Sequence, residues 1–216
     1  MTHQSLPRIA EPAVRPRELE ILDQIRGIFA EKGFDGASMQ ELARAAGMSV
    51  GNFYRYFPSK AAMVEAMITR DLAEVEEKFA CIAAAEDPLQ ALRSGLHARI
   101  AEGCSASDDD SAIWAEVTAA ARRKPEIAAV VERMEREICG YLCGAFALVV
   151  GVARDEAERR FMSHARLAVA LVKASTVQTG CREAVADPVQ TALMQRMIDL
   201  ILEEVCQAKA DTKDRG

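Results

Sequence analysis

Aromatic residues are scarce in this sequence, which holds one tryptophan, three tyrosines and seven phenylalanines among its 216 residues. Glycine and proline are few in the long middle segments, and no convincing run alternates between polar and apolar residues, which argues against a β-sheet. Half of the residues are nevertheless hydrophobic and alanine is abundant, a composition that favours helices packed around a sizeable core. We therefore expect an all-α protein.

Long apolar runs are missing as well. No stretch approaches the roughly 20 apolar residues that cross a bilayer, and residues 1–17 lack the apolar core of a secretory signal. We expect no membrane partner and a cytoplasmic location. Residues 1–15 contain prolines and no periodic apolar pattern, so they are expected to form a flexible arm, and the polar residues 210–216 a disordered tail.

The sequence also lacks the patterns that carry catalysis. It has no nucleophile–base pair, no Glu-x-x-His metal pattern and no glycine-rich phosphate loop. Its six cysteines are scattered without Cys-x-x-Cys spacing, which favours small buried side chains over disulfides or zinc ligands. Cys139 and Cys143 stand four apart on one face of an expected helix, so a role in thiol or metal sensing stays open. We expect no enzyme activity, no cofactor, and no catalytic or metal site.

A strong positive charge, the usual footprint of a nucleic-acid-binding protein, is absent. The formal net charge is −6. Residues 1–60 hold eight Lys or Arg and seven Asp or Glu, so the acidity lies in the rest of the chain. Charge alone would not indicate DNA binding. If the first region does bind DNA, its electrostatic contribution per subunit is modest and affinity depends on dimerisation.

The clearest pattern runs from Ser38 to Lys60 and reads SMQELARAAGMSVGNFYRYFPSK. Ser38 followed three residues later by Glu41 is the capping-box signature of a helix start. Gly47 suits the left-handed residue that ends a helix, and a second short helix is expected from about Val50 to Tyr56. Helix, glycine turn and helix make up the helix-turn-helix plan, whose second helix enters the DNA major groove.

The longer stretch GFDGASMQELARAAGMSVGNFYRYFPSK resembles the DNA-binding signature of the TetR family of bacterial transcriptional regulators. The matching positions are Gly33-Phe34, Ser38, Ala46-Gly47, the aromatic run Phe53 to Phe57, and Ser59-Lys60. The resemblance implies an N-terminal three-helix DNA-binding head and a C-terminal helical bundle that binds a ligand and forms a homodimer.

The second helix of the motif divides into two faces. Phe53 and Phe57 are four apart and should pack on the other helices of the head, whereas Asn52, Arg55 and Tyr56 point away from them. Asparagine suits adenine and arginine suits guanine in the major groove. Gly51 would let the backbone come close to DNA.

The resemblance assigns further DNA contacts. It places Ser49, Val50, Asn52 and Arg55 at the bases, Tyr54 and Tyr56 at phosphates through their hydroxyls, and the charge of Lys60 at the start of the next helix. Ser38, Gln40 and Arg44 are further phosphate candidates. For Tyr54 the alternative is packing in the core with only the hydroxyl exposed.

The expected domains are a helix-turn-helix domain at residues 16–62 and a ligand-binding and dimerisation domain at residues 63–209. Candidate cavity residues on the later helices, each of which also suits a plain core, are Trp114, Met134, Phe146, Phe161 and His164. The resemblance implies a small, largely apolar inducer in this domain. It also implies that the last two helices, expected at 155–180 and 187–209, pair with those of a second copy.

Together these features predict a ligand-responsive transcriptional regulator. It would be a repressor that a small molecule releases from a palindromic, double-stranded operator. The alternative is a helical adaptor or partner-binding protein with little DNA affinity, which the near-neutral charge of residues 1–60 favours.

Overall fold

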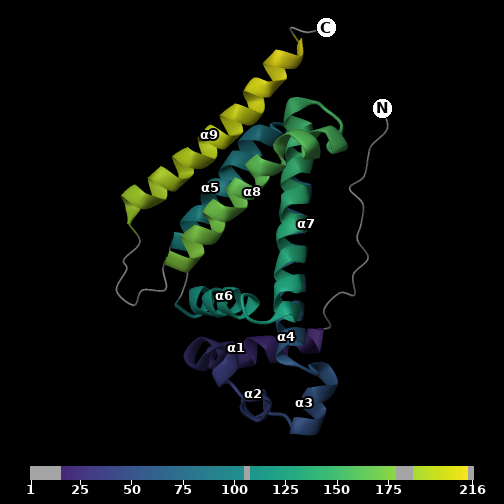
Figure 1. Cartoon of the computed structure of the whole chain (residues 1–216), viewed down its shortest axis with the longest axis vertical. Coiled ribbons are helices and arrows are strands. Elements are labelled where there is room, and N and C mark those ends of the chain that lie inside the picture. The colour runs from purple at the N-terminus through teal and green to yellow at the C-terminus, as the bar shows by residue number, and fades with distance from the viewer. Residues whose placement is uncertain (1–15, 105–107, 179–186, 214–216) are drawn as a thin grey trace.

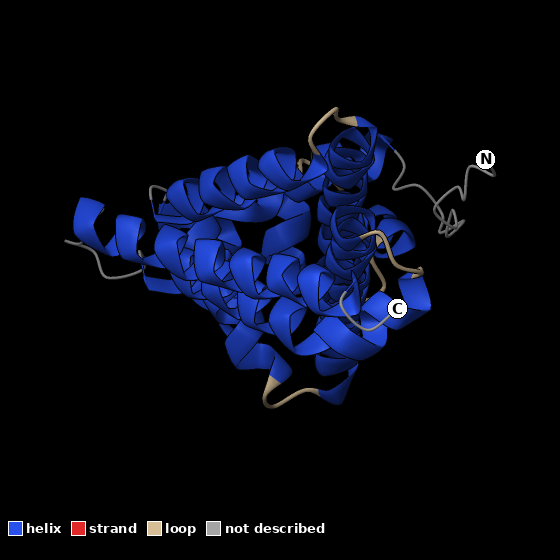
Figure 2. Ribbon diagram, turned by 90° about the horizontal axis from the view of Figure 1, so that it is seen from above, coloured by secondary structure: helices blue, strands red, loops and turns tan. Residues whose placement is uncertain are grey.

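The structure is a computed structural model that describes residues 16–104, 108–178 and 187–213, and within these ranges the chain is helical with short connections (Figures 1 and 2). The helices run in the order α1 (Pro16–Gly36), α2 (Met39–Ala45), α3 (Val50–Tyr56), α4 (Lys60–Ala84), α5 (Pro88–Cys104), α6 (Asp108–Ala121), α7 (Pro125–Val150), α8 (Arg154–Gln178) and α9 (Pro188–Lys213). The all-α architecture with a helix-turn-helix head is confirmed. The expected arm at 1–15 and the end of the tail lie outside the described residues.

The molecule is elongated, with α1, α2 and α3 at one end and α6 lying across α1 (Figure 1). The long helix α4 leaves this end and enters a bundle formed with α5, α7 and α8, and α9 lies on the outside of that bundle. Helices that share a long apolar stripe pack in this way because each must bury that stripe against a neighbour.

Local sequence signals set most helix ends. Ser38, Ser49 and Ser59 cap α2, α3 and α4, each accepting a hydrogen bond from a backbone N–H of the first turn. Gly47 has a positive φ of 63° in the turn between α2 and α3, and Gly151 one of 78° at the end of α7. The break expected at Gly47 is confirmed, and Gly151 ends α7 in the same way.

Buried side chains of the described residues form two hydrophobic cores. One joins α1–α3 and the first part of α4 to α6 and the start of α7, where Ile113, Val117 and Ile127 are buried against the head. This core therefore continues beyond the head expected at residues 16–62. The other lies among α5, α7, α8 and α9 and includes Leu142 and Phe146.

Two helices end later than local signals suggest. The regular part of α1 ends at Gly33, where φ is 69°, but one more helical turn follows and carries α1 to Gly36. Helix α9 continues to Lys213, past residue 210 where the tail was expected to begin. The segment before Lys213 contains no glycine or proline, so nothing in it breaks the helix.

Among the described residues, no single helix has both the length and the apolar character needed to span a membrane. Helices α7 and α8 meet these criteria only when taken together, as a pair bent by 114°.

Candidate functional site

The helix-turn-helix exposes one face of α3 at the end of the molecule. Phe53 and Phe57 are fully buried, with ring centroids 6.0 Å apart, and they fix α3 on the core of the head. Asn52 and Arg55 are exposed on the other side, as the spacing predicts. A Cβ added to Gly51 would meet no atom within 4 Å, so the protein itself leaves space there for a molecule that approaches α3.

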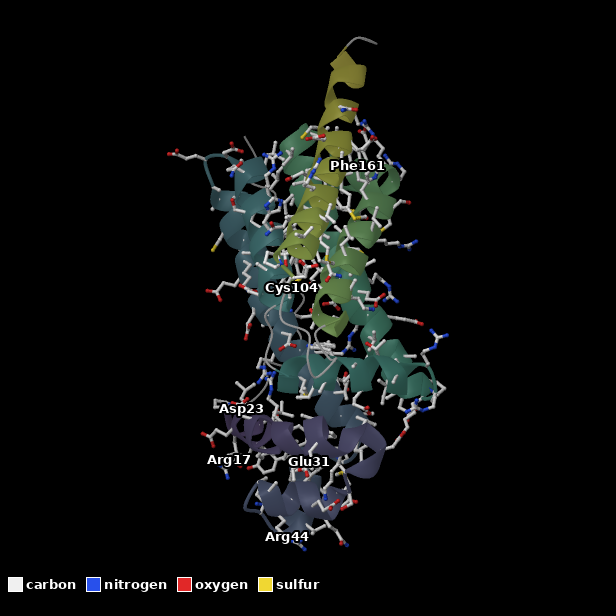
Figure 3. The ribbon with its side chains drawn as sticks, turned by 90° about the vertical axis from the view of Figure 1, so that its left-hand side faces the viewer. Arg17, Asp23, Glu31, Arg44, Cys104 and Phe161 are labelled. Atoms are coloured by element: carbon white, nitrogen blue, oxygen red, sulfur yellow. The ribbon has the colours of Figure 1, made fainter. Side chains whose placement is uncertain are left out.

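The neighbouring side chains divide between solvent and core. Tyr54 is 45% exposed and Val50 38% exposed, which removes the alternative that Tyr54 packs in the core. Tyr56 differs from expectation, because its ring is half-buried against the core of the head and leaves less of it available to a ligand. Gln40 and Arg44 are exposed on α2, and Figure 3 shows Arg44 at the end of the molecule far from Phe161.

Three of the predicted contact residues already have partners within the protein. The Ser49 hydroxyl accepts the N–H of Asn52 at 3.3 Å and so caps α3. The Ser38 hydroxyl accepts the N–H of Glu41 at 3.2 Å and donates to Glu41 Oε2 at 2.8 Å. Lys60 Nζ donates to the backbone carbonyl of Phe34 at 2.6 Å, and burial lowers the pKa of Lys60. These bonds hold the head together, so Ser38 and Lys60 are poorer candidates for phosphate contacts than the sequence predicts.

The turn after Gly33 joins the head to α6. The backbone N–H of Phe34 donates to Glu116 Oε2 on α6 at 3.1 Å. The carboxylate of Asp35 pairs with Lys124 and, at 3.1 Å, with Arg123, and both bonds lower the pKa of Asp35. The Lys124 ammonium also lies 5.0 Å from the centroid of the Phe34 ring. A shift of α6 would therefore be felt directly at the end of α1.

A second tie joins α1 to α4. Arg70 Nη1 on α4 lies 3.0 Å from Asp23 Oδ1 on α1, and Arg133 Nη2 on α7 lies 3.1 Å from Glu65 Oε1 on α4. One charged pair therefore ties α1 to α4, a second ties α4 to α7, and the Phe34 turn ties the head to α6.

A cavity of about 700 Å³ lies in the bundle between α4 and α8. Its volume falls within the roughly 300–1,000 Å³ of small-molecule sites. The apolar lining comes mainly from Val75, Phe79, Ile82, Leu92, Leu96, Trp114, Val117, Met134, Ile138, Leu142, Val169 and Val172. Charged side chains from α1, α4, α5 and α8 also line it, among them Arg26 and Arg70.

Only two of the five candidate cavity residues line the cavity. Trp114 and Met134 line it, as expected. Phe146, Phe161 and His164 do not: Phe146 and Phe161 are buried in the core formed with α9, with ring centroids 6.2 Å apart, and His164 packs edge-on to Phe161. Figure 3 shows Phe161 at the end of the bundle away from the head. These three residues take the alternative that the sequence left open, a place in or beside a filled core, because helical periodicity identifies buried positions without separating a filled core from a hollow one.

The residues that the prediction missed lie on α4 and α5. Phe79, Ile82, Leu92 and Leu96 are apolar residues that line the cavity. One signal was present in the sequence: Arg70, Glu74 and Lys78 recur every fourth residue beside the apolar stripe of α4. A line of charges next to apolar residues marks a partly wet surface rather than a closed core.

The paired cysteines lie in the core. Burial raises the pKa of both thiols, and for Cys143, with the charge of Glu158 as a further cause, to about 11. A thiol that stays protonated is a poor nucleophile and metal ligand. Among the described residues no group of three or more His, Cys, Asp or Glu side chains is placed to hold a metal ion.

Comparison with known proteins agrees with this geometry. A model of the family described as bacterial regulatory proteins, tetR family, matches residues 21–67. The HTH-type transcriptional regulator UidR of Escherichia coli K12 is 27% identical over 132 residues, which cover 59% of this chain and 63% of UidR. The matched segment thus spans less than two thirds of that relative.

A longer match covers more of its relative. The HTH-type transcriptional repressor Rv1474c of Mycobacterium tuberculosis is 31% identical over 144 residues, covering 61% of this chain and 72% of Rv1474c. Among solved structures, GusR of Salmonella enterica superposes with a TM-score of 0.63 at 22% identity, covering 91% of this chain and 100% of GusR. That similarity supports the fold along nearly the whole described chain.

Proposed function

Because the chain belongs to the tetR family of bacterial regulatory proteins, we propose that it is a transcriptional repressor that a small molecule releases from a palindromic operator. The observation that carries the proposal is the exposed face of α3, which presents Asn52 and Arg55 beside the vacant space at Gly51. A helix anchored by buried phenylalanines on one side and polar on the other is suited to the major groove.

The base contacts that we propose are Ser49, Val50, Asn52 and Arg55, with Gly51 allowing close approach. Tyr54, Gln40 and Arg44 are exposed and suited to phosphates, whereas Ser38, Tyr56 and Lys60 would contribute only after giving up part of their contacts inside the head. The modest basic charge of the head leaves little non-specific affinity, which supports binding as a dimer to two half-sites.

The inducer that we propose occupies the cavity of about 700 Å³, where most lining side chains are apolar. This cavity touches α6 through Trp114 and α4 through Val75, the two helices that are tied to α1. A ligand that favours one arrangement of these helices would therefore favour one position of the head.

The dimer surface that we propose lies on α8 and α9. Helix α9 buries Met194, Ile198 and Val205 inside the subunit, yet its opposite side exposes a second apolar stripe. That stripe consists of Val189, Leu193, Met197 and Leu200, and Leu167 on α8 is also exposed. Such a stripe at helical spacing is characteristic of an interface between helices. We place the protein in the cytoplasm, where operator DNA is found.

The test is genomic selection of DNA fragments by the purified full-length protein, followed by gel shift on the enriched fragments. We expect a palindromic sequence, and we expect Arg55→Ala to weaken its binding by about 10- to 100-fold, the cost of one lost base contact of about 1–3 kcal/mol. Arg136→Ala is the matched control, because Arg136 is an exposed arginine on α7.

The control should leave binding unchanged. Absence of any enriched sequence at low salt would refute the repressor proposal and favour the helical adaptor. Equal losses in Arg55→Ala and Arg136→Ala would show that only overall charge matters, and that α3 reads no sequence. Lys60→Ala is unsuitable for this purpose, because it would also remove the bond to the Phe34 carbonyl.

A further inference from the structure

The wall of the cavity carries more positive than negative charge. Its positive side chains are Arg26, Arg70, Lys78, Arg99 and Lys173, and its acidic ones are Asp71, Glu74 and Glu102. Some of these charges are already paired: Arg99 lies 3.4 Å from Glu102, and Lys173 pairs with Glu135. All of them lie beside the apolar lining. A site of this composition suits a molecule with an apolar body and a charged end.

Arg70 occupies a special position in this wall. It lines the cavity, yet Nη1 reaches Asp23 on α1 at 3.0 Å and Nε reaches the neighbouring Asp71 at 3.4 Å. The Arg70 side chain is 20% exposed, whereas that of Asp23 is 64% exposed. The bond to Asp23 thus runs from the cavity to the surface of the head, and water competes for it at one end.

Asp71 is the second carboxylate that contacts the guanidinium of Arg70, and it is a weak partner. Burial raises the pKa of the Asp71 carboxyl, against the opposing effect of Arg70 and Arg26. The contact between Arg70 Nε and Asp71 Oδ1 is also long, at 3.4 Å, so it is a weak hydrogen bond. An acid group arriving from the cavity would meet an arginine that can bind it through two parallel hydrogen bonds.

The cavity also has the length for an extended body. From Arg70 to Ile82, both of which line it, α4 rises by about 18 Å at 1.5 Å per residue. Phe79 and Ile82 from α4 lie in the same lining as Leu92 and Leu96 from α5, so the apolar part of a ligand would follow the groove between these helices.

We propose that the effector is an anionic amphiphile whose acid group binds Arg70 in competition with Asp23, while its apolar body lies along α4 and α5. The inference rests on the proposed function, since it names the class of inducer that this cavity takes. Binding replaces the Arg70–Asp23 bond between α4 and α1 with a bond to the ligand. The head then loses the charged pair that ties α1 to α4.

The experiment uses the full-length protein and three probes that share one apolar chain: decanoate, decan-1-ol and decylamine, each at concentrations where it stays monomeric. Isothermal titration calorimetry gives the affinities. The fluorescence of Trp114, the single tryptophan and a cavity residue, reports whether the probe enters the cavity. We expect decanoate to bind about tenfold or more tighter than decanol, with a change in Trp114 emission, and decylamine to bind weakest.

Two variants shift the affinity in opposite directions. Arg70→Gln should remove the preference for the acid and leave decanol binding in place. Asp23→Asn should tighten decanoate binding by about two- to fivefold, because the exposed competitor for Arg70 has lost its charge. A merely structural role of the pair would weaken binding in both variants. Arg136→Gln, on the exposed part of α7, is the matched control and should change nothing.

Equal binding of acid and alcohol, tighter binding of the amine, or no binding of decanoate would each overturn the inference. So would an unchanged or weakened decanoate affinity in Asp23→Asn. In gel shifts, decanoate should release DNA from the unmodified protein, whereas Arg70→Gln, which already lacks the bond to Asp23, should bind DNA more weakly and show no further response to decanoate. If the protein binds DNA but does not prefer decanoate to decanol, this inference alone is refuted. If the DNA selection enriches no sequence, the repressor proposal itself is refuted.

Discussion

The turn between the head and α6 depends on a glycine, so Gly33→Ala should destabilise the protein strongly. Gly33 has φ 69° and ψ 173°, a region that essentially only glycine populates. A Cβ built there would lie 2.7 Å from Glu116 Oε2 and 3.0 Å from Glu116 Cδ. Glu116 could swing away, but it would then give up the N–H of Phe34, which it accepts at 3.1 Å.

The expected cost can be built from these two parts. The backbone conformation costs an alanine about 1–3 kcal/mol, and losing a hydrogen bond to a charged group costs about 1.5–3 kcal/mol. We expect Gly33→Ala to lower the free energy of unfolding by about 3 kcal/mol or more. For a chain of this length, where 1 kcal/mol shifts Tm by about 2–4 °C, that corresponds to a fall of about 6–12 °C.

Gly27 provides the control in the same helix. It lies in the regular part of α1, and an added Cβ would meet nothing within 4 Å. Gly27→Ala should stabilise the protein by about 0.5–1 kcal/mol, because alanine is the better residue in a helix interior. Thermal unfolding followed by circular dichroism, at one protein concentration for all variants, measures both changes.

A double variant separates strain from collision. In a Glu116→Ala background the clash and the hydrogen bond are already gone, so Gly33→Ala should then cost only the backbone part. A Gly33→Ala protein as stable as Gly27→Ala would refute the assignment of Gly33 as a conformationally required glycine. An equal cost in both backgrounds would show that Glu116 has no part in it.

Three further predictions concern acid stability, thiol chemistry and assembly. The hydrogen bond from Lys32 is the main cause that lowers the pKa of Glu41 to about 2. The contribution of Glu41 to stability is therefore present above the unfolded pKa of about 4.5 and is lost as pH falls towards 2. Glu41→Gln should flatten the pH dependence of Tm between these two values. Brief alkylation of the native protein followed by peptide mapping should find Cys81 modified well before Cys143. Cys81 is exposed, whereas Cys143 is buried and its raised pKa keeps it a thiol. Equal labelling of the two would contradict the placement of α7. Leu200→Glu, at a side chain 60% exposed on α9, should shift the protein from dimer to monomer in sedimentation without loss of helix content, and an unchanged dimer would exclude this face.

The parts of the fold that local chemistry determines could be predicted from the sequence. Helix α3 has its predicted bounds, Val50–Tyr56, because Ser49 and Gly47 act on backbone groups within a few residues of themselves. The burial of Phe53 and Phe57 followed from their spacing alone. In each case the interaction that determines the structure joins residues within two helical turns of each other.

What could not be predicted depends on residues far apart in the chain. The bond from Phe34 to Glu116 spans 82 positions, and no periodic pattern records it. The partner of Lys60 is a backbone carbonyl, which carries no sequence signal. The cavity is harder still, because Phe161 and Phe79 are equally apolar on a helical stripe, yet one closes a core and the other lines a space.

The second apolar stripe of α9 bears on the behaviour of a single subunit. A lone protomer would present Val189, Leu193, Met197 and Leu200 to water, a surface prone to unspecific association. Each newly made chain would then have to meet a partner before it meets unrelated apolar surfaces. The rate of pairing grows with the square of the protomer concentration, whereas a lone protomer can bind unrelated apolar surfaces at any concentration. Where few copies are made, the amount of paired protein would therefore rise more steeply than the number of chains.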